Sequence, residues 1–580
     1  MNFYVNFNSQ LEFDGSIWVW NYSKFPPRKI KLQITLIKNK GINYSRDGST
    51  LRIDQVKDTS NGNQIYTNLE QIQFLQWSGE FGKNNQKIGR WTATWKEDTL
   101  KNVGGEYSEE GEKQGLWNEL IKSFCDQAEV YAVGQYMNGQ KQAIWKYLYN
   151  DKEIGGGSYD AGIKKGRWIQ LSDDFFQKSQ VTYNGEFKNG KKVGRWDIFF
   201  KGQYQKQYQK IGGGYYEEGT GSAKMRRWIE LQDGFNNYSQ VIYNGEFQNG
   251  KKVGIWSIFY KKYDEIEFKQ LQYNHLYKSF SGCGSYSNGN KTGMWIELQN
   301  GFDHYSQVTY KGIYKNGKKV SRWDILYRQY DEKEFQQIGG GLYTEEGNGI
   351  KIGRWIQLDE EFRYNSQLTY HGEYKNDKKF GNWDSFYRKH DESTFKLIGG
   401  GSYDEDGIKI GRWVELNDGF NYYQQISSIG QYKNGKRVGK WDILYRKDDQ
   451  REFEQIGGGS YGKEGDGIRN GIWTELSNEF QKDYQTTYYG QYLKGNKIGR
   501  WNILFRRLDE KIFKQIGGGS YDERGNGIKT GRWIELTDRY DNYSSVTYDG
   551  LYKQGKKVGI WVKQGLIYGH QIYKEMIYDI

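Results

Sequence analysis

Residues 181–200 read VTYNGEFKNGKKVGRWDIFF, and two other segments, VIYNGEFQNGKKVGIWSIFY (241–260) and VTYDGLYKQGKKVGIW (546–561), repeat them closely. In the first, a run of alternating apolar and polar residues leads into Asn189-Gly190, and a second alternating run follows. Asn-Gly between such runs is the strongest local signal for a β-hairpin, because a two-residue type I′ turn requires positive φ at both central residues. The stretch therefore predicts a hairpin, and its recurrence predicts a chain built from hairpins.

A tryptophan closes each copy of the motif, which reads G-x-aromatic, a turn, a basic residue and G-x-Trp. Two forms alternate: form A, such as GGGSYDAGIKKGRWIQL (155–171), and form B, such as YNGEFKNGKKVGRWDIF (183–199). Seventeen of the 21 tryptophans occupy the last motif position, and we expect them to be structural: Trp91, Trp117, Trp145, Trp168, Trp196, Trp228, Trp256, Trp295, Trp323, Trp355, Trp383, Trp413, Trp441, Trp473, Trp501, Trp533 and Trp561.

The spacing between these tryptophans indicates which connection is fixed in length. From an A tryptophan to the following B tryptophan it is always 28 residues, as from Trp168 to Trp196. From B to the next A it varies between 23 and 39 residues. We therefore expect the A–B pair to be a rigid unit and the B-to-A segment to be a surface loop that tolerates insertion.

Period-two alternation assigns the two faces of each hairpin. One face is polar, with Arg195 and Asp197 among its members. The other combines aromatic residues with glycine: Val181, Tyr183, Gly185, Phe187, Gly194, Trp196, Ile198 and Phe200.

Comparison of the copies suggests a role for each glycine. Asp377 replaces the turn glycine in one copy, and aspartate tolerates positive φ, so this turn position is predicted to be left-handed. Ala143, Arg226 and Ser321 replace the glycine two residues before tryptophan. We therefore expect that glycine to be extended and kept small so that an aromatic ring can lie over it. The same is expected of the Gly-Gly-Gly runs that open form A.

These patterns predict an all-β protein, an elongated antiparallel meander of tandem hairpins on the order of 160 Å long before twisting. A closed propeller is the alternative, because one A–B pair could be a four-stranded blade. Residues 1–70 are predicted to form a small β cap, 71–562 the hairpin array and 563–580 a C-terminal cap. Within the N-terminal segment, residues 28–37 alternate cleanly, which predicts a strand, and Asp47-Gly48 signals a hairpin. Within the array, residues 120–130 favour a short helix.

Composition limits the classes of function. The net charge of +12 comes from 84 basic and 72 acidic residues, a dispersed balance typical of a solvated surface. Two cysteines, Cys125 and Cys283, make no disulfide framework, so we expect a reducing, cytoplasmic compartment. We also expect no signal peptide, because residues 1–20 lack a basic segment followed by an apolar core.

The motif resembles the MORN repeat, and more closely the tryptophan-containing variant of YwqK-antitoxin-like proteins. The segment that carries the resemblance is YNGEFKNGKKVGRW, residues 183–196. The likeness extends over roughly residues 77–561, and form A, with its Gly-Gly-Gly opening and acidic turn, departs from it. The resemblance implies a ribbon of hairpins that scaffolds proteins or associates with membranes.

Two sets of residues are candidates for binding. The first is the basic pair at each form B turn, which would form a row along one edge of the sheet, interrupted by acidic form A turns; charges that only keep a sheet edge soluble are the alternative. The pairs are Lys191, Lys192, Lys251, Lys252, Lys318, Lys319, Lys378, Lys379, Lys436, Arg437, Lys556 and Lys557. The second is a docking loop in the longest B-to-A segment: Tyr273, Leu276, Tyr277 and Phe280.

No pattern in the sequence indicates catalysis. The five histidines are scattered without metal-ligand spacing, and no nucleophile or phosphate-loop motif occurs. We expect a non-catalytic scaffold for an unidentified partner protein, without cofactor, nucleic acid or small-molecule substrate. Peripheral binding to an anionic membrane or a cytoskeletal structure is one alternative, and an antitoxin-like inhibitor of a partner protein is another.

Overall fold

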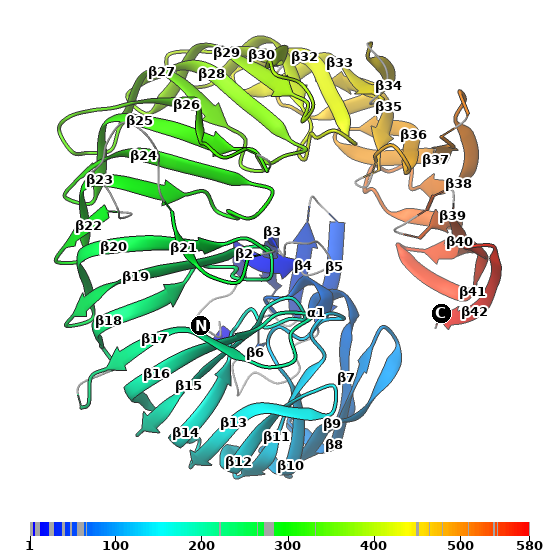
Figure 1. Cartoon of the computed structure of the whole chain (residues 1–580). Coiled ribbons are helices and arrows are strands. Elements are labelled where there is room, and N and C mark those ends of the chain that lie inside the picture. The colour runs from blue at the N-terminus through cyan, green and yellow to red at the C-terminus, as the bar shows by residue number, and fades with distance from the viewer. Residues whose placement is uncertain are drawn as a thin grey trace. The chain divides into compact units, whose positions relative to one another are not determined.

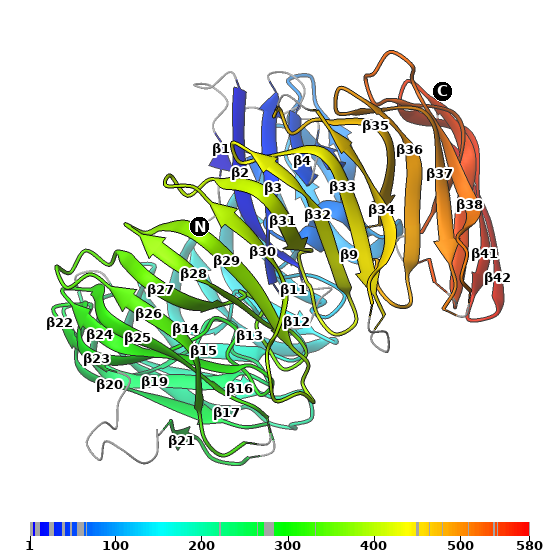
Figure 2. The ribbon, with the colours of Figure 1, turned by 90° about the horizontal axis from the view of Figure 1, so that it is seen from above.

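The structure, a computed structural model, describes residues 4–5, 12–21, 28–37, 41–46, 49–54, 63–64, 66–219, 222–263, 265–271, 284–330, 332–447, 452–462, 465–477, 480–508, 510–537, 540–541 and 543–578. It divides into two compact units, residues 1–304 and 305–580. Each unit is built almost entirely of antiparallel strands that follow one another in chain order (Figures 1 and 2). The predicted all-β meander of tandem hairpins is thus confirmed.

The first unit begins with β1 (Tyr4–Val5), which pairs with β6 (Asn63–Gln64), and with a sheet of β2 (Glu12–Asn21), β3 (Arg28–Ile37), β4 (Gly41–Arg46) and β5 (Ser49–Asp54). The predicted strand 28–37 is β3, and its Leu32 and Ile34 are buried as the alternation required. Strands β4 and β5 pair Arg46 with Ser49, which confirms a two-residue hairpin connection.

A helix that the sequence analysis missed, α1 (Leu69–Phe74), covers this sheet. Asn68 caps it by accepting a hydrogen bond from the Glu70 amide at 3.0 Å. Leu69 and Ile72 pack against Leu32, Ile34, Ile42 and Tyr44. The Asn68 amide also donates to the Phe124 carbonyl at 2.8 Å, which ties the helix to the first A–B connection of the array.

The array of the first unit runs from β7 to β23. Its strands are β7 (Leu75–Phe81), β8 (Lys87–Trp95), β9 (Asp98–Tyr107), β10 (Lys113–Leu120), β11 (Val130–Met137), β12 (Gln140–Tyr149), β13 (Lys152–Asp160), β14 (Ile163–Leu171), β15 (Gln180–Lys188), β16 (Lys191–Lys201), β17 (Gln209–Tyr216), β18 (Lys224–Leu231), β19 (Gln240–Gln248), β20 (Lys251–Lys261), β21 (Lys269–Gln270), β22 (Gly284–Ser287) and β23 (Asn290–Leu298).

The second unit continues the same pattern. Its strands are β24 (Gln307–Lys315), β25 (Lys318–Arg328), β26 (Gln336–Tyr343), β27 (Lys351–Leu358), β28 (Gln367–Lys375), β29 (Lys378–Arg388), β30 (Lys396–Tyr403), β31 (Lys409–Leu416), β32 (Gln425–Lys433), β33 (Lys436–Arg446), β34 (Glu454–Tyr461), β35 (Arg469–Leu476), β36 (Gln485–Leu493), β37 (Asn496–Arg506), β38 (Lys514–Tyr521), β39 (Lys529–Leu536), β40 (Ser544–Lys553), β41 (Lys556–Ile567) and β42 (His570–Tyr578).

The turn of the hairpin at residues 181–200 has the predicted geometry. Asn189 has φ 50° and Gly190 φ 74°, both in the left-handed region that a type I′ turn requires. Asp377, which replaces the second turn residue in another copy, has φ 66°, so the left-handed prediction at this position is confirmed.

The glycine two residues before tryptophan does not have the predicted role. Gly194, two residues before Trp196, is left-handed at φ 65°, and so is Ala143 at φ 54° in the same position of another copy. The residue under the ring is instead Gly185 on the preceding strand, where an added Cβ would lie 2.3 Å from Trp196 Cδ2. The prediction of an extended Gly194 was wrong because this residue belongs to a β-bulge.

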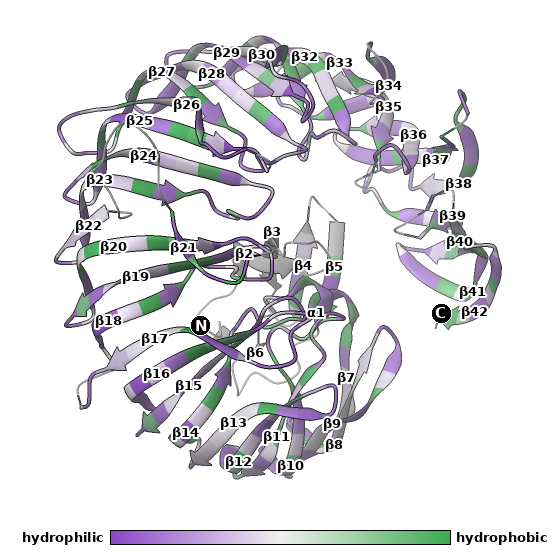
Figure 3. Ribbon diagram, in the orientation of Figure 1, coloured by the Kyte–Doolittle hydropathy of each residue, from purple (hydrophilic) through white to green (hydrophobic). Residues whose placement is uncertain are grey.

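The bulge also explains why the predicted faces are right. Glu186 pairs with Val193 and Asn184 with Asp197, so β16 advances four residues while β15 advances two. An insertion of two residues returns the side chains beyond the bulge to the face they would have occupied without it. Figure 3 shows short hydrophobic bands separated by hydrophilic ones along the strands.

The A–B connection is fixed by buried contacts between successive repeats. In the connection from β18 to β19, Phe235 is buried and packs edge-on against Phe200 of the previous B hairpin, with ring centroids 5.1 Å apart. Ser179, in the previous connection, donates a hydrogen bond to the Phe235 carbonyl at 2.5 Å. Ser239 makes the same bond to Phe302. This serine–phenylalanine stitch links these successive A–B connections to one another.

The helix predicted for residues 120–130 was wrong, because this segment is the first A–B connection. Its Phe124, Cys125 and Ala128 are buried, and the Ala128 amide donates to the Cys125 carbonyl in a tight turn. The apolar residues that suggested a helix are therefore packed onto the sheet by turns.

Candidate binding surface

An unbroken ladder of aromatic rings crosses one face of the sheet in each unit. Trp196 lies between Phe187 and Tyr216, with centroids 5.1 and 6.2 Å away and nearly perpendicular planes. Such edge-to-face contacts add to the free energy of burial. No motif tryptophan is more than 6% exposed. The aromatic partners between the tryptophans are Phe81, Tyr107, Tyr136, Tyr159, Phe187, Tyr216, Phe247 and Tyr286 in the first unit and Tyr314, Tyr343, Tyr374, Tyr403, Tyr432, Tyr461, Tyr492, Tyr521, Tyr552 and Tyr578 in the second.

A layer of cations covers this ladder, and it includes half of the predicted turn residues. The second basic residue of each turn lies over the tryptophan of its own hairpin, as Lys192 Nζ does at 4.1 Å from the Trp196 centroid. The second residues, all half-buried, are Lys192, Lys252, Lys319, Lys379, Arg437 and Lys557. The first residues, all exposed, are Lys191, Lys251, Lys318, Lys378, Lys436 and Lys556.

The exposed turn lysines have partners in some of the neighbouring form A turns. Lys378 forms an ion pair with Asp406 at 3.1 Å, and Lys251 donates to the Asn288 side chain at 3.2 Å. An ion pair as exposed as that of Lys378 contributes little to stability, but it reduces the positive potential at its turn, whereas the Asn288 side chain is neutral. The edge is therefore less basic than the sequence of form B alone suggests.

A buried carboxylate joins pairs of cations within the layer. Glu230 on β18 accepts from Lys224 of its own strand and from Lys252 of the next hairpin, the second at 2.8 Å. We call this arrangement a carboxylate clasp. The described clasps centre on Glu119 (Lys113 and Lys141), Glu230 (Lys224 and Lys252), Glu415 (Lys409 and Arg437), Glu475 (Arg469 and Lys497) and Glu535 (Lys529 and Lys557).

The electrostatic effect of a clasp is strong. Burial by itself would raise the pKa of Glu119, but the ammonium groups of Lys113 and Lys141 outweigh burial and hold this pKa at about 2. In the clasps of Glu230, Glu415 and Glu535 the pKa of the carboxyl is lowered for the same reason. Each of these four carboxylates is thus strongly held in the charged form.

The lowered pKa of Glu119 predicts how the stability of the fold depends on pH. A carboxyl whose pKa is lower in the folded state stabilises the fold above the unfolded pKa, and that contribution is lost as pH falls toward the folded pKa. Glu119→Gln should therefore lower the melting temperature clearly at pH 7, and the difference from the unsubstituted chain should shrink as pH falls from about 4.5 toward 2. Thermal melts at several pH values measure this, and a difference independent of pH would contradict it.

Two form A strands have glutamine where the others have the clasp carboxylate. Gln170 takes the place of the carboxylate in the repeat that contains Lys164 and Lys192, and Gln357 takes it in the repeat that contains Lys351 and Lys379. Among the residues that the structure describes, no carboxylate forms an ion pair with any of these four lysines. We call these two positions open clasps.

The lysines of the open clasps have lowered pKa values. Burial first, and then repulsion from neighbouring lysines, lower the pKa of Lys164, Lys192 and Lys379 to about 8. The pKa of Lys351 is also lowered, chiefly by burial. Among the described residues, each open clasp therefore holds two half-buried cations with no carboxylate in direct ion-pair contact, and only the longer-range attraction of Asp173 for Lys164 and Lys192, and of Asp377 for Lys351, opposes the burial.

The sequence analysis missed the strand residues of the clasps, although a signal was present. A basic residue recurs six positions before a glutamate in form A, as in Lys224 and Glu230 or Lys409 and Glu415. A separation of six places both side chains on the same face of a strand. The two exceptions, Gln170 and Gln357, stand at the position of this glutamate in two other copies of form A.

The predicted docking loop lies outside the described residues. Tyr273, Leu276, Tyr277 and Phe280 fall between β21 and β22. Both of these strands pair with β20, since Tyr260 pairs with Lys269 and Trp256 with Gly284.

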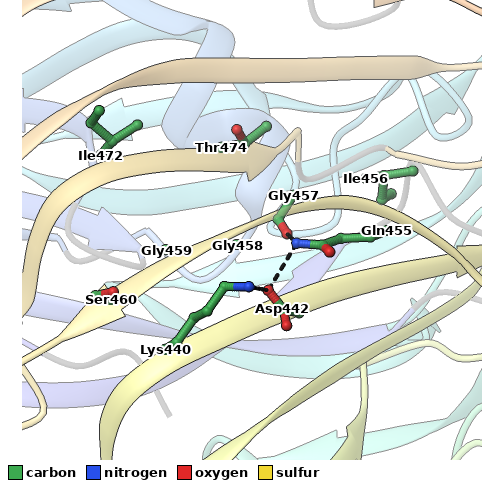
Figure 4. Close-up of a pocket in the computed structure, with 10 residues that line it drawn as sticks. All are labelled: Lys440, Asp442, Gln455, Ile456, Gly457, Gly458, Gly459, Ser460, Ile472 and Thr474. Carbon is green, nitrogen blue, oxygen red and sulfur yellow. Dashed lines mark hydrogen bonds and ion pairs between the residues drawn. The ribbon is translucent and has the colours of Figure 1, made fainter.

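The opposite face of the sheet has a shallow hollow over a Gly-Gly-Gly run (Figure 4). It exists because glycines 457–459 have no side chains to fill it. Asp442 at its edge already accepts from Lys440 at 3.0 Å and from Gln455 at 2.8 Å. Both contacts are made to Oδ1 of this carboxylate, and the lining offers no nucleophile beside a base.

Among the described residues there is no group of three or more histidine, cysteine, aspartate or glutamate side chains that could hold a metal ion. His304 is buried, and His371 stacks near Phe386 at 4.2 Å between centroids. Burial raises the pKa of the Cys125 thiol to about 12, which keeps it protonated and unreactive.

The only helix in the described part of the chain, α1, has six residues, and no described helix is long and apolar enough to cross a membrane.

Comparison with known proteins identifies no family for this chain. No family model matches it, and no curated protein matches it. Among solved structures, a functionally unknown protein from Desulfotomaculum acetoxidans is 10% identical, with 68% of this chain and 97% of that chain covered and a TM-score of 0.17. The NanB sialidase from Streptococcus pneumoniae is also 10% identical, with 98% and 94% covered and a TM-score of 0.18. Both TM-scores are too low for either likeness to bear on fold or function.

Proposed function

We propose that this chain is a non-catalytic scaffold that binds a partner protein along the face that carries the cation layer. The observation that carries the proposal is the regular layering of this face, in which buried aromatic rings hold a cation over each form B tryptophan. Side chains that are already ordered lose little conformational entropy on binding, so such a surface is prepared for a partner. Its repetition from hairpin to hairpin suits an extended protein segment better than a small molecule.

The chemistry of this face favours a protein partner over a membrane. Tyrosine and arginine are enriched in protein interfaces, and the half-buried Tyr183, Tyr370 and Arg437 belong to this face. An anionic membrane would instead use the exposed turn lysines, of which Lys378 is already paired. An antitoxin-like role is a special case of the same proposal, with a toxin as the partner.

Site-specific photocrosslinking in native extract tests the proposal. An aromatic crosslinking amino acid at position 183 or 488 lies on the cation-layer face beside Lys192 or Lys497 and keeps both cations, and positions 195 and 500 of the same hairpins lie on the opposite face. We expect mass spectrometry to find one partner crosslinked from 183 and 488 in stoichiometric amounts, and little of it from 195 and 500.

Two outcomes would overturn the scaffold proposal. One is equal crosslinking from both faces, which would indicate non-specific contact. The other is sedimentation of the full chain with phosphatidylserine vesicles at physiological salt, with no crosslinked protein, which would favour the membrane alternative because attraction to anionic lipid depends on the exposed cations.

A further inference from the structure

The five carboxylate clasps show what the cation layer binds within this chain. Each places one carboxylate between two cations, and Glu230 is 2.8 Å from Lys252 on one side while Lys224 holds it on the other. Hydrogen bonds between charged groups are about twice as strong as those between neutral groups. The layer is thus a series of identical binding sites for carboxylates, most of them filled by the chain itself.

The open clasps keep the geometry of the filled ones. Lys164 Nζ is 4.5 Å from the Trp168 centroid, against 4.8 Å for Lys224 over Trp228. Lys192 is 4.1 Å from its tryptophan, against 4.0 Å for Lys252. The tryptophan rings therefore hold the ammonium groups in place whether or not a carboxylate lies between them.

The open clasp of the second unit has the same properties. Lys351 and Lys379 are 4.9 and 4.1 Å from the centroids of Trp355 and Trp383. Gln357 Oε1 accepts from the Tyr374 hydroxyl at 3.0 Å, as Glu415 does from Tyr432 at 2.9 Å. The glutamine thus preserves the tyrosine contact of a closed clasp while supplying no negative charge.

Two half-buried cations at one place are unfavourable unless an anion compensates them. The neighbouring clasps on either side of Gln170, centred on Glu119 and Glu230, are closed, so the excess positive charge is confined to one repeat. A localised pair of cations flanked by aromatic edges, such as Tyr183 and Phe187, fits one carboxylate on a carbon chain rather than an extended polyanionic surface.

We propose that each open clasp binds one carboxylate side chain from an acidic segment of the partner protein. The inference rests on the scaffold function proposed above and adds its specificity: one aspartate or glutamate enters at Lys164 and Lys192, and another at Lys351 and Lys379. The incoming carboxylate lies on the solvent side of the glutamine and bridges the two ammonium groups, as the chain's own glutamates do in the closed clasps.

The test uses the full chain and a fluorescently labelled hexaglutamate peptide, with binding measured by anisotropy. The double variant Gln170→Glu, Gln357→Glu supplies the missing carboxylates and closes both clasps. We expect it to weaken peptide binding by at least about tenfold and to raise the melting temperature, because each site loses charge-assisted hydrogen bonds to the peptide and gains internal ones. The rise in melting temperature also shows that the variant is folded.

A matched control separates the clasps from net charge. Gln207→Glu, Gln554→Glu adds the same two charges at exposed positions outside the cation layer, and its affinity for the peptide should stay within about twofold of that of the unsubstituted chain. In the converse variant, Glu230→Gln opens a third clasp and should raise the number of peptides bound from two to three. Equal weakening by the control and the closing variant, or no weakening by either, would overturn the proposal.

Further measurements distinguish a carboxylate from phosphate as the bound anion, and failure of the clasp inference from failure of the scaffold proposal. Inorganic phosphate that displaces the peptide at equal concentration would overturn the preference for a carboxylate. A crosslinked partner whose recovery is unchanged by Gln170→Glu, Gln357→Glu would contradict the clasp inference and leave the scaffold standing. Peptide binding that is lost in the closing variant, with no partner crosslinked from positions 183 and 488, would support the clasps and contradict the scaffold.

Discussion

Trp196→Ala should destabilise its hairpin and the adjacent ones by about 3–5 kcal/mol. The side chain is 1% exposed, lies between Phe187 and Tyr216, and donates from Nε1 to the Glu186 carbonyl at 3.2 Å. Its removal opens a void over Gly185 and leaves Lys192 without the ring beneath it. Because each repeat contacts mainly its neighbours, the damage should stay local.

Hydrogen exchange followed by mass spectrometry measures this effect and its extent. Amides in β15, β16 and β17 should exchange faster, whereas those in β40 and β41 should be unchanged. Trp196→Phe keeps an aromatic ring in the ladder and should show a smaller effect in the same strands. If Trp196→Ala abolished the β signal of the whole chain at 25 °C, the array would be one cooperative unit and the local model would be wrong.

Gly213→Ala should be more damaging than its small size suggests. Gly213 has φ 124°, and an added Cβ would lie 2.2 Å from the Trp196 carbonyl oxygen and 2.8 Å from the Asp197 Cα. These are backbone atoms of the paired strand, so they cannot move without breaking the pairing of β16 with β17. We expect a loss of about 3 kcal/mol or more in the free energy of unfolding.

Gly194→Ala is the matched control for this prediction. Gly194 also has positive φ, at 65°, but no atom lies within 4 Å of an added Cβ, and Ala143 occupies the same position in another copy. Its cost should be about 1–2 kcal/mol, the strain of a left-handed alanine. Urea unfolding of both variants decides, and equal losses would show that the contact with the Trp196 carbonyl yields more easily than expected.

Local sequence patterns predicted the hairpins because turn and alternation are determined by neighbouring residues. Asn189-Gly190 requires a type I′ turn whatever surrounds it, and the alternation around Trp196 assigns the faces. The bulge at Gly194 was not predictable from substitution alone, because Ala143, Arg226 and Ser321 look incompatible with positive φ. Pairing with the next strand compensates that strain, and pairing is not visible in one strand's sequence.

The clasps show a similar limit. The turn lysines were found because they recur beside an obvious turn, yet Lys192 and Lys191 look equivalent in sequence and differ completely in the fold. One lies over Trp196 and the other is exposed. The glutamate that pairs with the second turn cation lies on another hairpin. Glu230, for example, meets Lys252 only because the strand register brings them together.

The serine–phenylalanine stitch has a consequence for how this chain can change in length. Ser179 bonds to Phe235, Ser239 in turn bonds to Phe302, and Ser366 bonds to Phe420, so each of these connections gives a bond to the one after it, whereas Gln424 and Tyr484 stand at the serine position of two later connections. Removal or duplication of a complete A–B pair between two serine-bearing connections therefore leaves a matching serine and phenylalanine at the new junction. Genetic duplication of such a pair can thus lengthen the protein by one pair and keep this hydrogen bond. The insertion or deletion of a single residue within a connection would instead separate Ser179 from its acceptor.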